Sequence, residues 1–321
     1  MNFLKQMCTD LNTDPGYVKL VGRYAARYYR HFQIPKRAGG KRTICQPSAV
    51  LKAFQYWLTQ NLVAYLPVSE YATAYRLGCS IKRNAGFHLG AKHVLHLDVK
   101  DYFPSIKSSM LLDRISVDGK KIPGGDRLDD EDFQLISWIC FLEDQLTIGS
   151  VCAPAISNAV MYPLDCEVAA QVRALKLTYT RYADDMVFSG PDFIDNKFVP
   201  QVQALLSTHG LQLNDRKTRF MGGADKQLVT GITLNSGRLS IGRERKDGIR
   251  KMLYVWLKTG QGTPARIMGH LQFLRDVEPE TFNSLIQKYN FLFKTNIMAR
   301  FKDDSAPTAA REAAATKSVP S

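Results

Sequence analysis

The sequence predicts an α+β fold in which helical parts flank a central sheet. Apolar residues recur at helical spacing near both ends of the chain, whereas short runs with strand patterning lie in its middle. Strand and helix patterns follow one another there in a mixed order, which is typical of α+β proteins. The 321 residues, 45% of them hydrophobic, are enough for a sizeable core in one to three domains.

The first hundred residues predict helices, a hairpin and one strand. Residues 1–31 have helical apolar spacing, and residues 34–48 read as two strands joined by the turn Ala38-Gly39-Gly40. A helix is expected over residues 51–66. Residues 93–98 (HVLHLD) form an apolar strand that ends at an aspartate, where a sheet presents functional groups.

The rest of the chain predicts helices around a second hairpin. Residues 177–190 (LTYTRYADDMVFSG) read as two short strands with two aspartates at their turn. The other expected elements are helices over 131–143, 156–175 and 199–210, a strand pair over 228–234 and 238–243, and helices after that. Residues 303–321 are poor in large apolar groups and predict a disordered or partially helical tail.

Net charge indicates a polyanionic partner. The chain has 43 lysines and arginines against 30 acidic residues, which gives a net charge of +13. Residues 1–50 hold nine basic residues against two aspartates, and a second basic stretch covers 243–300. The basic segments therefore flank an acidic middle, a layout that suits phosphate binding around a metal site. The alternative is a basic protein without such a partner.

The cysteines and the hydropathy pattern point to the cytoplasm. None of the six cysteines forms a C-x-x-C pair, so they read as reduced thiols rather than zinc ligands. The sequence has neither a secretion leader at Met1 nor an apolar run of 18 residues. We therefore expect a cytoplasmic protein with no membrane partner.

Three aspartates predict a divalent-metal site. Asp184 and Asp185 are adjacent at the expected hairpin turn, where their charges repel unless a cation lies between them. If the strand that ends at Asp98 pairs beside this hairpin, the three carboxylates converge on one point. Such a set suits Mg²⁺, and two ions there could activate a 3′-hydroxyl and stabilise a departing pyrophosphate. The alternative for the Asp pair alone is an acidic surface turn.

The motifs of the chain resemble those of bacterial retron reverse transcriptases. Asp98 followed by Phe103, a segment with Gly149, Pro154 and Asn158, and Tyr182-Ala183-Asp184-Asp185 are similar to motifs A, B and C of reverse transcriptases. Two further signatures match the retron type, namely N-A-x-x-H at residues 84–88 and V-T-G at 229–231. The resemblance covers roughly residues 15–290.

This resemblance implies a right-hand palm polymerase with two Mg²⁺ ions. Its metal site would consist of Asp98, Asp184 and Asp185, with Val99 beside Asp98. The implied domains are N-terminal helices and fingers over 1–95, a palm over 96–237 with a fingers insertion at about 106–145, a helical thumb over 238–300, and a flexible tail over 301–321.

Further residues are assigned to the nucleotide by the same resemblance. Phe103 would clash with a 2′-hydroxyl and so select dNTPs, although a core aromatic is the alternative. Lys41 and Arg42 would bind the triphosphate, and Lys217 would neutralise or protonate the leaving pyrophosphate; for each, a solvated basic side chain is the alternative. Gly149 and Tyr182 complete the implied nucleotide site.

Motif B departs from the family pattern. It reads Ile148-Gly149-Ser150-Val151-Cys152-Ala153-Pro154 and lacks the glutamine and the first proline of the family's Q-G-A-P-S-S-P-like segment. The template or dNTP contacts usually made by those positions are therefore in doubt.

The expected RNA-binding residues lie on both sides of the palm. In residues 243–257, apolar side chains form one helical face, while Arg243, Lys246 and Arg250 share another face that could follow a phosphate backbone. The resemblance adds Val229, Thr230 and Gly231 as RNA-recognition residues. Asn84 and His88 are expected either to contact RNA or to have a structural role.

The resemblance implies reverse transcription of a cognate structured noncoding RNA. Synthesis would start from the 2′-hydroxyl of an internal guanosine and give RNA-linked single-stranded DNA (msDNA). A role in phage defence with a separate effector protein is also implied. The alternatives are another bacterial reverse transcriptase, of the group II intron or diversity-generating type, and a noncatalytic RNA-binding scaffold.

Overall fold

The computed structural model describes residues 3–36 and 39–305, which form two compact units, Met1–Gly222 and Gly223–Ser321. Residues 306–321, most of the predicted tail, lie outside the described residues, as does Ala38 of the predicted hairpin turn. The two units are described separately below.

The N-terminal unit begins with helices and a hairpin, as the sequence predicts. Helix α1 (Phe3–Asp10) is followed by α2 (Pro15–Arg23), whose first turn is capped by the Asp14 carboxylate. A short 3-10 helix (Ala25–Tyr28) then leads into strand β1 (Tyr29–Pro35), which pairs antiparallel with β2 (Lys41–Pro47). The predicted N-terminal helical segment therefore ends three residues early, at Tyr28, because Tyr29 already starts the hairpin.

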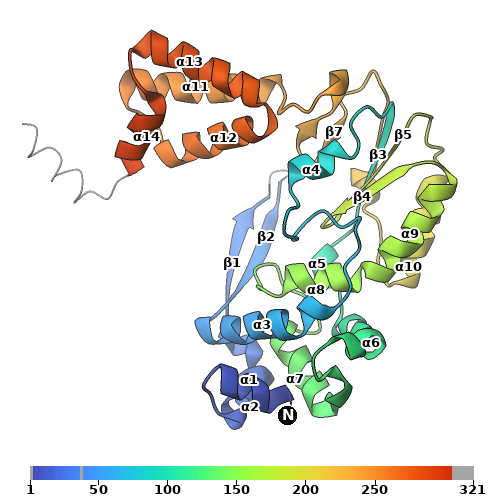
Figure 1. The fold of residues 1–321 in the computed structure, drawn as a ribbon. Helices are drawn as coiled ribbons and strands as arrows, with labels where there is room; N and C mark the ends of the chain where they lie inside the picture. The colour runs from blue at the N-terminus through green and yellow to red at the C-terminus, as the bar shows by residue number, and fades with distance from the viewer. Residues whose placement is uncertain (1–2, 37–38, 306–321) are drawn as a thin grey trace, which may run out of the picture. The chain divides into compact units, whose positions relative to one another are not determined.

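A four-stranded sheet forms the centre of this unit (Figure 1). Its order is β4 (Thr178–Tyr182), β5 (Asp185–Gly190), β3 (His93–Asp98) and β6 (Arg219–Met221), and every pairing is antiparallel. The strand that ends at Asp98 and the hairpin around the Asp pair are confirmed. The expected pairing of this strand with the hairpin is confirmed as well.

Further helices complete this unit, some beside the sheet and others away from it (Figure 1). In chain order they are α3 (Ala49–Asn61), α4 (Ile81–Gly86), α5 (Tyr102–Ser105), α6 (Ser108–Asp118), α7 (Asp130–Cys140), α8 (Ala153–Val160), α9 (Tyr162–Ala174) and α10 (Phe198–Thr208). On one face of the sheet, Phe188 of β5 stacks on Tyr179 of β4 and makes an edge contact with Phe198 of α10. Side chains alternate between the faces of a strand, so the residues next to Tyr179 and Phe188 point the other way, towards α4.

The C-terminal unit is a helical bundle after a small hairpin. Strands β7 (Leu228–Val229) and β8 (Ile232–Thr233) precede α11 (Arg243–Thr259), α12 (Pro264–Val277), α13 (Pro279–Phe293) and α14 (Ile297–Ser305). The apolar face predicted for α11 is buried, with Leu253 and Trp256 almost inaccessible. Residues 238–243 join this hairpin only through a single bridge between Thr233 and Ser240, so the predicted second strand is wrong.

Among residues 3–36 and 39–305, no helix is both long and apolar enough to cross a membrane.

Candidate active site

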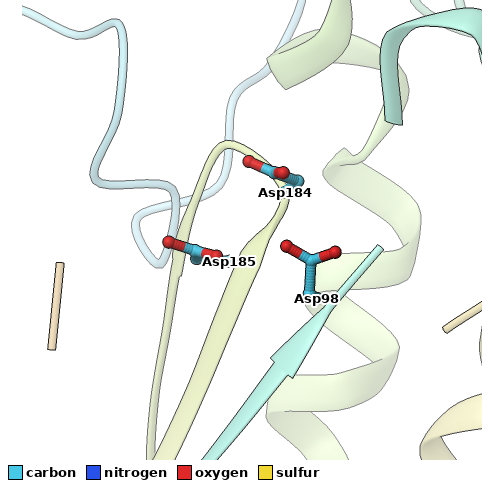
Figure 2. A group of neighbouring side chains, drawn as sticks. All are labelled: Asp98, Asp184 and Asp185. Carbon is cyan, nitrogen blue, oxygen red and sulfur yellow. The ribbon is translucent and has the colours of Figure 1, made fainter. Parts of the chain in front are cut away.

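Antiparallel pairing brings the three predicted metal ligands together. Asp98 at the end of β3 pairs with Asp185 at the start of β5, and Asp185 also pairs with Tyr182. Asp184 lies in the turn of the same hairpin, and its carbonyl accepts a hydrogen bond of 2.9 Å from the Val99 N–H. Carboxylate oxygens of Asp98, Asp184 and Asp185 lie within 4.8 Å of one another (Figure 2). This set of hard oxygen donors fits a divalent cation such as Mg²⁺.

The turn that carries Asp184 is tight and has an unusual backbone. Only Ala183 and Asp184 separate the paired residues Tyr182 and Asp185, and Ala183 has a φ of 57°. The left-handed conformation at the first loop position matches the twist of a two-residue hairpin but is disfavoured for alanine. The Ala183 carbonyl accepts a hydrogen bond of 3.2 Å from the Arg181 guanidinium, which stabilises the turn.

Burial and mutual repulsion perturb the ionisation of the carboxylates. Desolvation, followed by the charges of Asp185 and Asp98, raises the pKa of Asp184 to about 6. Lys217 lies beside these three aspartates, and its Nζ donates a hydrogen bond of 2.8 Å to Asp98 Oδ2. Burial lowers the pKa of Lys217, but the bond to Asp98 and the surrounding carboxylates outweigh burial and raise it overall. The ammonium group therefore stays charged beside the aspartates.

His96 is a site residue that the sequence analysis did not identify. It lies two residues before Asp98, hence on the same face of β3, and its Nε2 is 3.2 Å from Asp185 Oδ1. Burial lowers the pKa of His96, whereas the bond and charge of Asp185 raise it, and the net shift is upward. The period-2 spacing of His96 and Asp98 was the signal that could have revealed it.

A buried arginine links the hairpin to the rest of the palm-like sheet region. Arg181, fully inaccessible, makes a bidentate ion pair with Asp165 of α9 through bonds of 2.8 and 2.7 Å. Its Nη1 also donates to the Tyr102 hydroxyl at 2.9 Å and to Asn158 Oδ1 at 3.4 Å. Arg181 thus ties the Asp184 turn to the segments after Asp98 and in motif B. A charged residue inside a short strand otherwise made of threonine and tyrosine was the sequence signal for this network.

Motif B approaches the β1–β2 hairpin at Gly149. Gly149 has a φ of 113°, and a Cβ atom there would lie 2.8 Å from the Cys45 carbonyl oxygen. The preceding Ile148 carbonyl accepts a hydrogen bond of 2.8 Å from the Cys45 N–H. A side chain at 149 would therefore clash with β2, which explains the glycine independently of any nucleotide contact.

The remaining predicted nucleotide residues lie at different places in the N-terminal unit. Phe103 on α5 is half-buried, and its ring centroid is 5.3 Å from that of Tyr102. Tyr182, also half-buried, lies in one row with Asp185 and Asp98 across the sheet. Lys41 and Arg42 are exposed at the start of β2. Their binding of a triphosphate stays a prediction.

Of the two roles left open for Asn84 and His88, RNA contact or structure, their packing supports the structural one. Both are buried, with 0% and 1% of their surface exposed. His88 binds Ser189 Oγ through Nδ1 and Thr180 Oγ1 through Nε2, each at 2.7 Å, and Asn84 Oδ1 accepts from Thr73 Oγ1 at 2.8 Å. Asn84 and His88 of the N-A-x-x-H signature therefore connect α4 to the rest of the unit and to β4 and β5, and their own side chains present almost no surface.

The predicted RNA residues of the C-terminal unit are only partly accessible. The Val229 side chain is fully buried in the small hairpin, so contact with RNA through it is excluded, whereas Thr230 and Gly231 form the turn with φ of 45° and 83°. Lys246 points to Glu278, with Nζ and Oε2 3.0 Å apart, and does not share an open face with Arg243. Arg243 and Arg250 are exposed and pair with Asp247.

Comparison with known proteins places the chain in a family. Residues 34–234 match the sequence model of the family described as reverse transcriptase (RNA-dependent DNA polymerase). The retron Mx65 reverse transcriptase of Myxococcus xanthus is 33% identical over 279 residues, which cover 83% of this chain and 65% of that protein. Two Escherichia coli proteins, the retron Ec86 and retron Ec83 reverse transcriptases, are 28% and 30% identical, and the matches cover 88% and 91% of their lengths.

The chain therefore belongs to the reverse transcriptase family, and within that family to the retron type. The match spans slightly less than two thirds of the Myxococcus relative. The family consists of RNA-dependent DNA polymerases with the right-hand palm fold. Family members use a divalent metal, for which the three aspartates are suitable ligands.

Proposed function

We propose that this protein copies a structured noncoding RNA into RNA-linked single-stranded DNA by metal-dependent nucleotidyl transfer. The observation that carries this proposal is the convergence of Asp98, Asp184 and Asp185 within 4.8 Å at the end of the sheet. A scaffold without activity would gain nothing from this arrangement, because burial and repulsion disfavour the charge on Asp184.

Each residue of the site has a role in this reaction. Asp98, Asp184 and Asp185, with Val99 next to them, would hold two Mg²⁺ ions, which supply activation of the attacking hydroxyl and neutralisation of the departing pyrophosphate. The charged Lys217 ammonium group lies 2.8 Å from Asp98 Oδ2. It would add a positive charge beside the departing pyrophosphate. It is therefore a candidate proton donor to the leaving group.

Nucleotide selection is assigned to the surroundings of the aspartates. Phe103 would exclude a 2′-hydroxyl by a steric clash, with Tyr182 close to the same site. Lys41 and Arg42 on the β1–β2 hairpin would bind the triphosphate, and Gly149 allows motif B to pack against this hairpin. Accordingly, residues 1–95 and 106–145 are proposed as fingers, the rest of 96–237 as palm and 238–300 as thumb.

The partners follow from the retron relatives. Because these relatives are named as retron reverse transcriptases, a cognate retron RNA is the proposed template and msDNA the proposed product. The Thr230-Gly231 turn, of which Gly231 is exposed and Thr230 half-buried, and the exposed Arg243 and Arg250 side chains are the proposed RNA contacts of the C-terminal unit. A cytoplasmic phage-defence role with a separate effector protein completes the proposal.

A primer-extension assay tests this function. Wild-type protein with Mg²⁺, dNTPs and a primed RNA should incorporate nucleotides, and Asp184→Ala should not. Incorporation that survives Asp184→Ala, or none by the wild type on any RNA, would contradict the proposal and favour a noncatalytic RNA-binding scaffold. Sequencing of copurified nucleic acid distinguishes the retron type, since only this type predicts RNA covalently joined to short DNA.

A further inference from the structure

Tyr75 combines an unfavourable backbone conformation with an exposed aromatic ring. Its φ is 58°, in the left-handed region that bulky side chains rarely adopt, and 51% of its surface is exposed. Neither feature contributes to the stability of the fold by itself. Such strain concentrates at functional sites, where the surrounding structure holds it in place.

The chain on the N-terminal side of Tyr75 is held rigidly. The Thr73 N–H donates to the Arg181 carbonyl at 2.8 Å, and the Ala74 carbonyl accepts from Asn158 Nδ2 at 2.9 Å. Thr73 and Ala74 are each only 1% exposed. The two residues before Tyr75 are therefore fixed to the strand that leads to Asp184 and to the helix of motif B, and the left-handed turn at Tyr75 then directs its ring outwards.

The ring of Tyr75 lies among the residues assigned to the nucleotide. Its centroid is 6.4 Å from that of Phe103, at an interplanar angle of 45°. Burial, followed by the nearby Asp184 and Tyr182, raises the pKa of the Tyr75 phenol, while Arg42 opposes this shift.

We propose that Tyr75 is a specificity-determining residue of the nucleotide site, whose ring packs against Phe103 and holds that ring where it excludes a 2′-hydroxyl. This inference rests on the proposed polymerase function and deepens it. Tyr102 is the second aromatic neighbour of Phe103, with 5.3 Å between the two ring centroids. The Phe103 ring therefore contacts two aromatic rings, those of Tyr75 and Tyr102. Loss of the Tyr75 ring would leave Phe103 free to change rotamer and admit ribonucleotides.

The test measures single-nucleotide incorporation of dCTP and CTP by the wild type and three variants. Tyr75→Ala should reduce the preference for dCTP, expressed as the ratio of kcat/KM values, by about tenfold, equivalent to the loss of roughly 1.4 kcal/mol. Tyr75→Phe keeps the ring and should retain the wild-type ratio. Tyr56→Ala is the matched control, because Tyr56 is 53% exposed on α3 and makes none of these contacts.

A double variant separates support of Phe103 from an independent effect. If Tyr75 acts through Phe103, adding Tyr75→Ala to Phe103→Ala should change the ratio no further. An unchanged ratio in Tyr75→Ala, an equal loss in Tyr56→Ala, or full additivity in the double variant would overturn the inference. Alanine accepts the left-handed region no worse than tyrosine, and thermal denaturation checks that the variants fold. Failure of the wild type to incorporate dCTP would instead refute the polymerase function itself.

Discussion

Replacement of Asp184 by asparagine should stabilise the metal-free protein, although it should abolish polymerisation. Burial and the charges of Asp185 and Asp98 raise the pKa of Asp184 from 3.8 to about 6. At about 1.4 kcal/mol per pKa unit, the ionised carboxylate costs the folded state up to about 3 kcal/mol at neutral pH. Asparagine has nearly the same shape and carries no charge, so it removes this cost.

The sign of the pH dependence follows from the raised pKa. Because the unfolded chain gives up this proton at lower pH than the folded protein, the contribution of Asp184 to stability is fully present below about pH 4 and is lost as the pH rises through 6. The Asp184→Asn variant lacks this contribution. The two proteins should therefore differ least near pH 4 and most above pH 7.

Thermal unfolding in EDTA, at several pH values, measures the difference. For units of about this size, 1 kcal/mol shifts Tm by about 2–4 °C, so Asp184→Asn should raise Tm by up to about 10 °C at pH 7.5. Added Mg²⁺ should raise Tm of the wild type more than that of the variant, since a cation that binds only the folded state stabilises it. Asp192→Asn, at an exposed aspartate of the same unit, is the control and should change little. A metal-free Asp184→Asn protein less stable than the wild type would refute the reasoning.

Three further variants test other parts of the site. Phe103→Ala should admit rNTPs in primer extension, and unchanged discrimination would remove Phe103 from the nucleotide site. His88→Ala, which deletes two buried hydrogen bonds of 2.7 Å, should destabilise the protein by about 3 kcal/mol in urea unfolding while RNA affinity of the folded fraction stays constant. Weaker RNA binding at unchanged stability would restore His88 as a contact. Arg243→Gln with Arg250→Gln should lower the slope of log K against log salt by about 1.5, whereas an unaltered slope would exclude both from the RNA surface.

The sequence by itself determined the class of fold and the three aspartates of the candidate metal site. Strand patterning located both the strand ending at Asp98 and the hairpin at Asp184 and Asp185, because alternation of apolar residues is a local property of the chain. The repulsion between adjacent aspartates already indicated a cation, and the sheet register confirmed that Asp98 joins them.

Several side-chain roles depended on contacts that no local pattern encodes. The sequence left Asn84 and His88 between RNA contact and structure, and only the packing of α4 on the sheet showed both to be buried. Lys246 lies at helical spacing from Arg243, but its ammonium group forms an ion pair with Glu278, thirty-two residues later in the chain. The ion-pair partners of His96 and Arg181 could likewise not be predicted from the sequence, because Asp185 and Asp165 lie on other elements of the chain than the residues they pair with.

Charge, strand patterning and turn signals depend on residues that are neighbours in the sequence. The sequence alone therefore identified which groups carry charge, where strands end and where the chain turns. Burial and pairing arise only when distant segments pack, as Tyr75 does against Phe103, twenty-eight positions further along the chain. The tertiary structure therefore decided which of the polar and aromatic residues are exposed and which are buried in the interior.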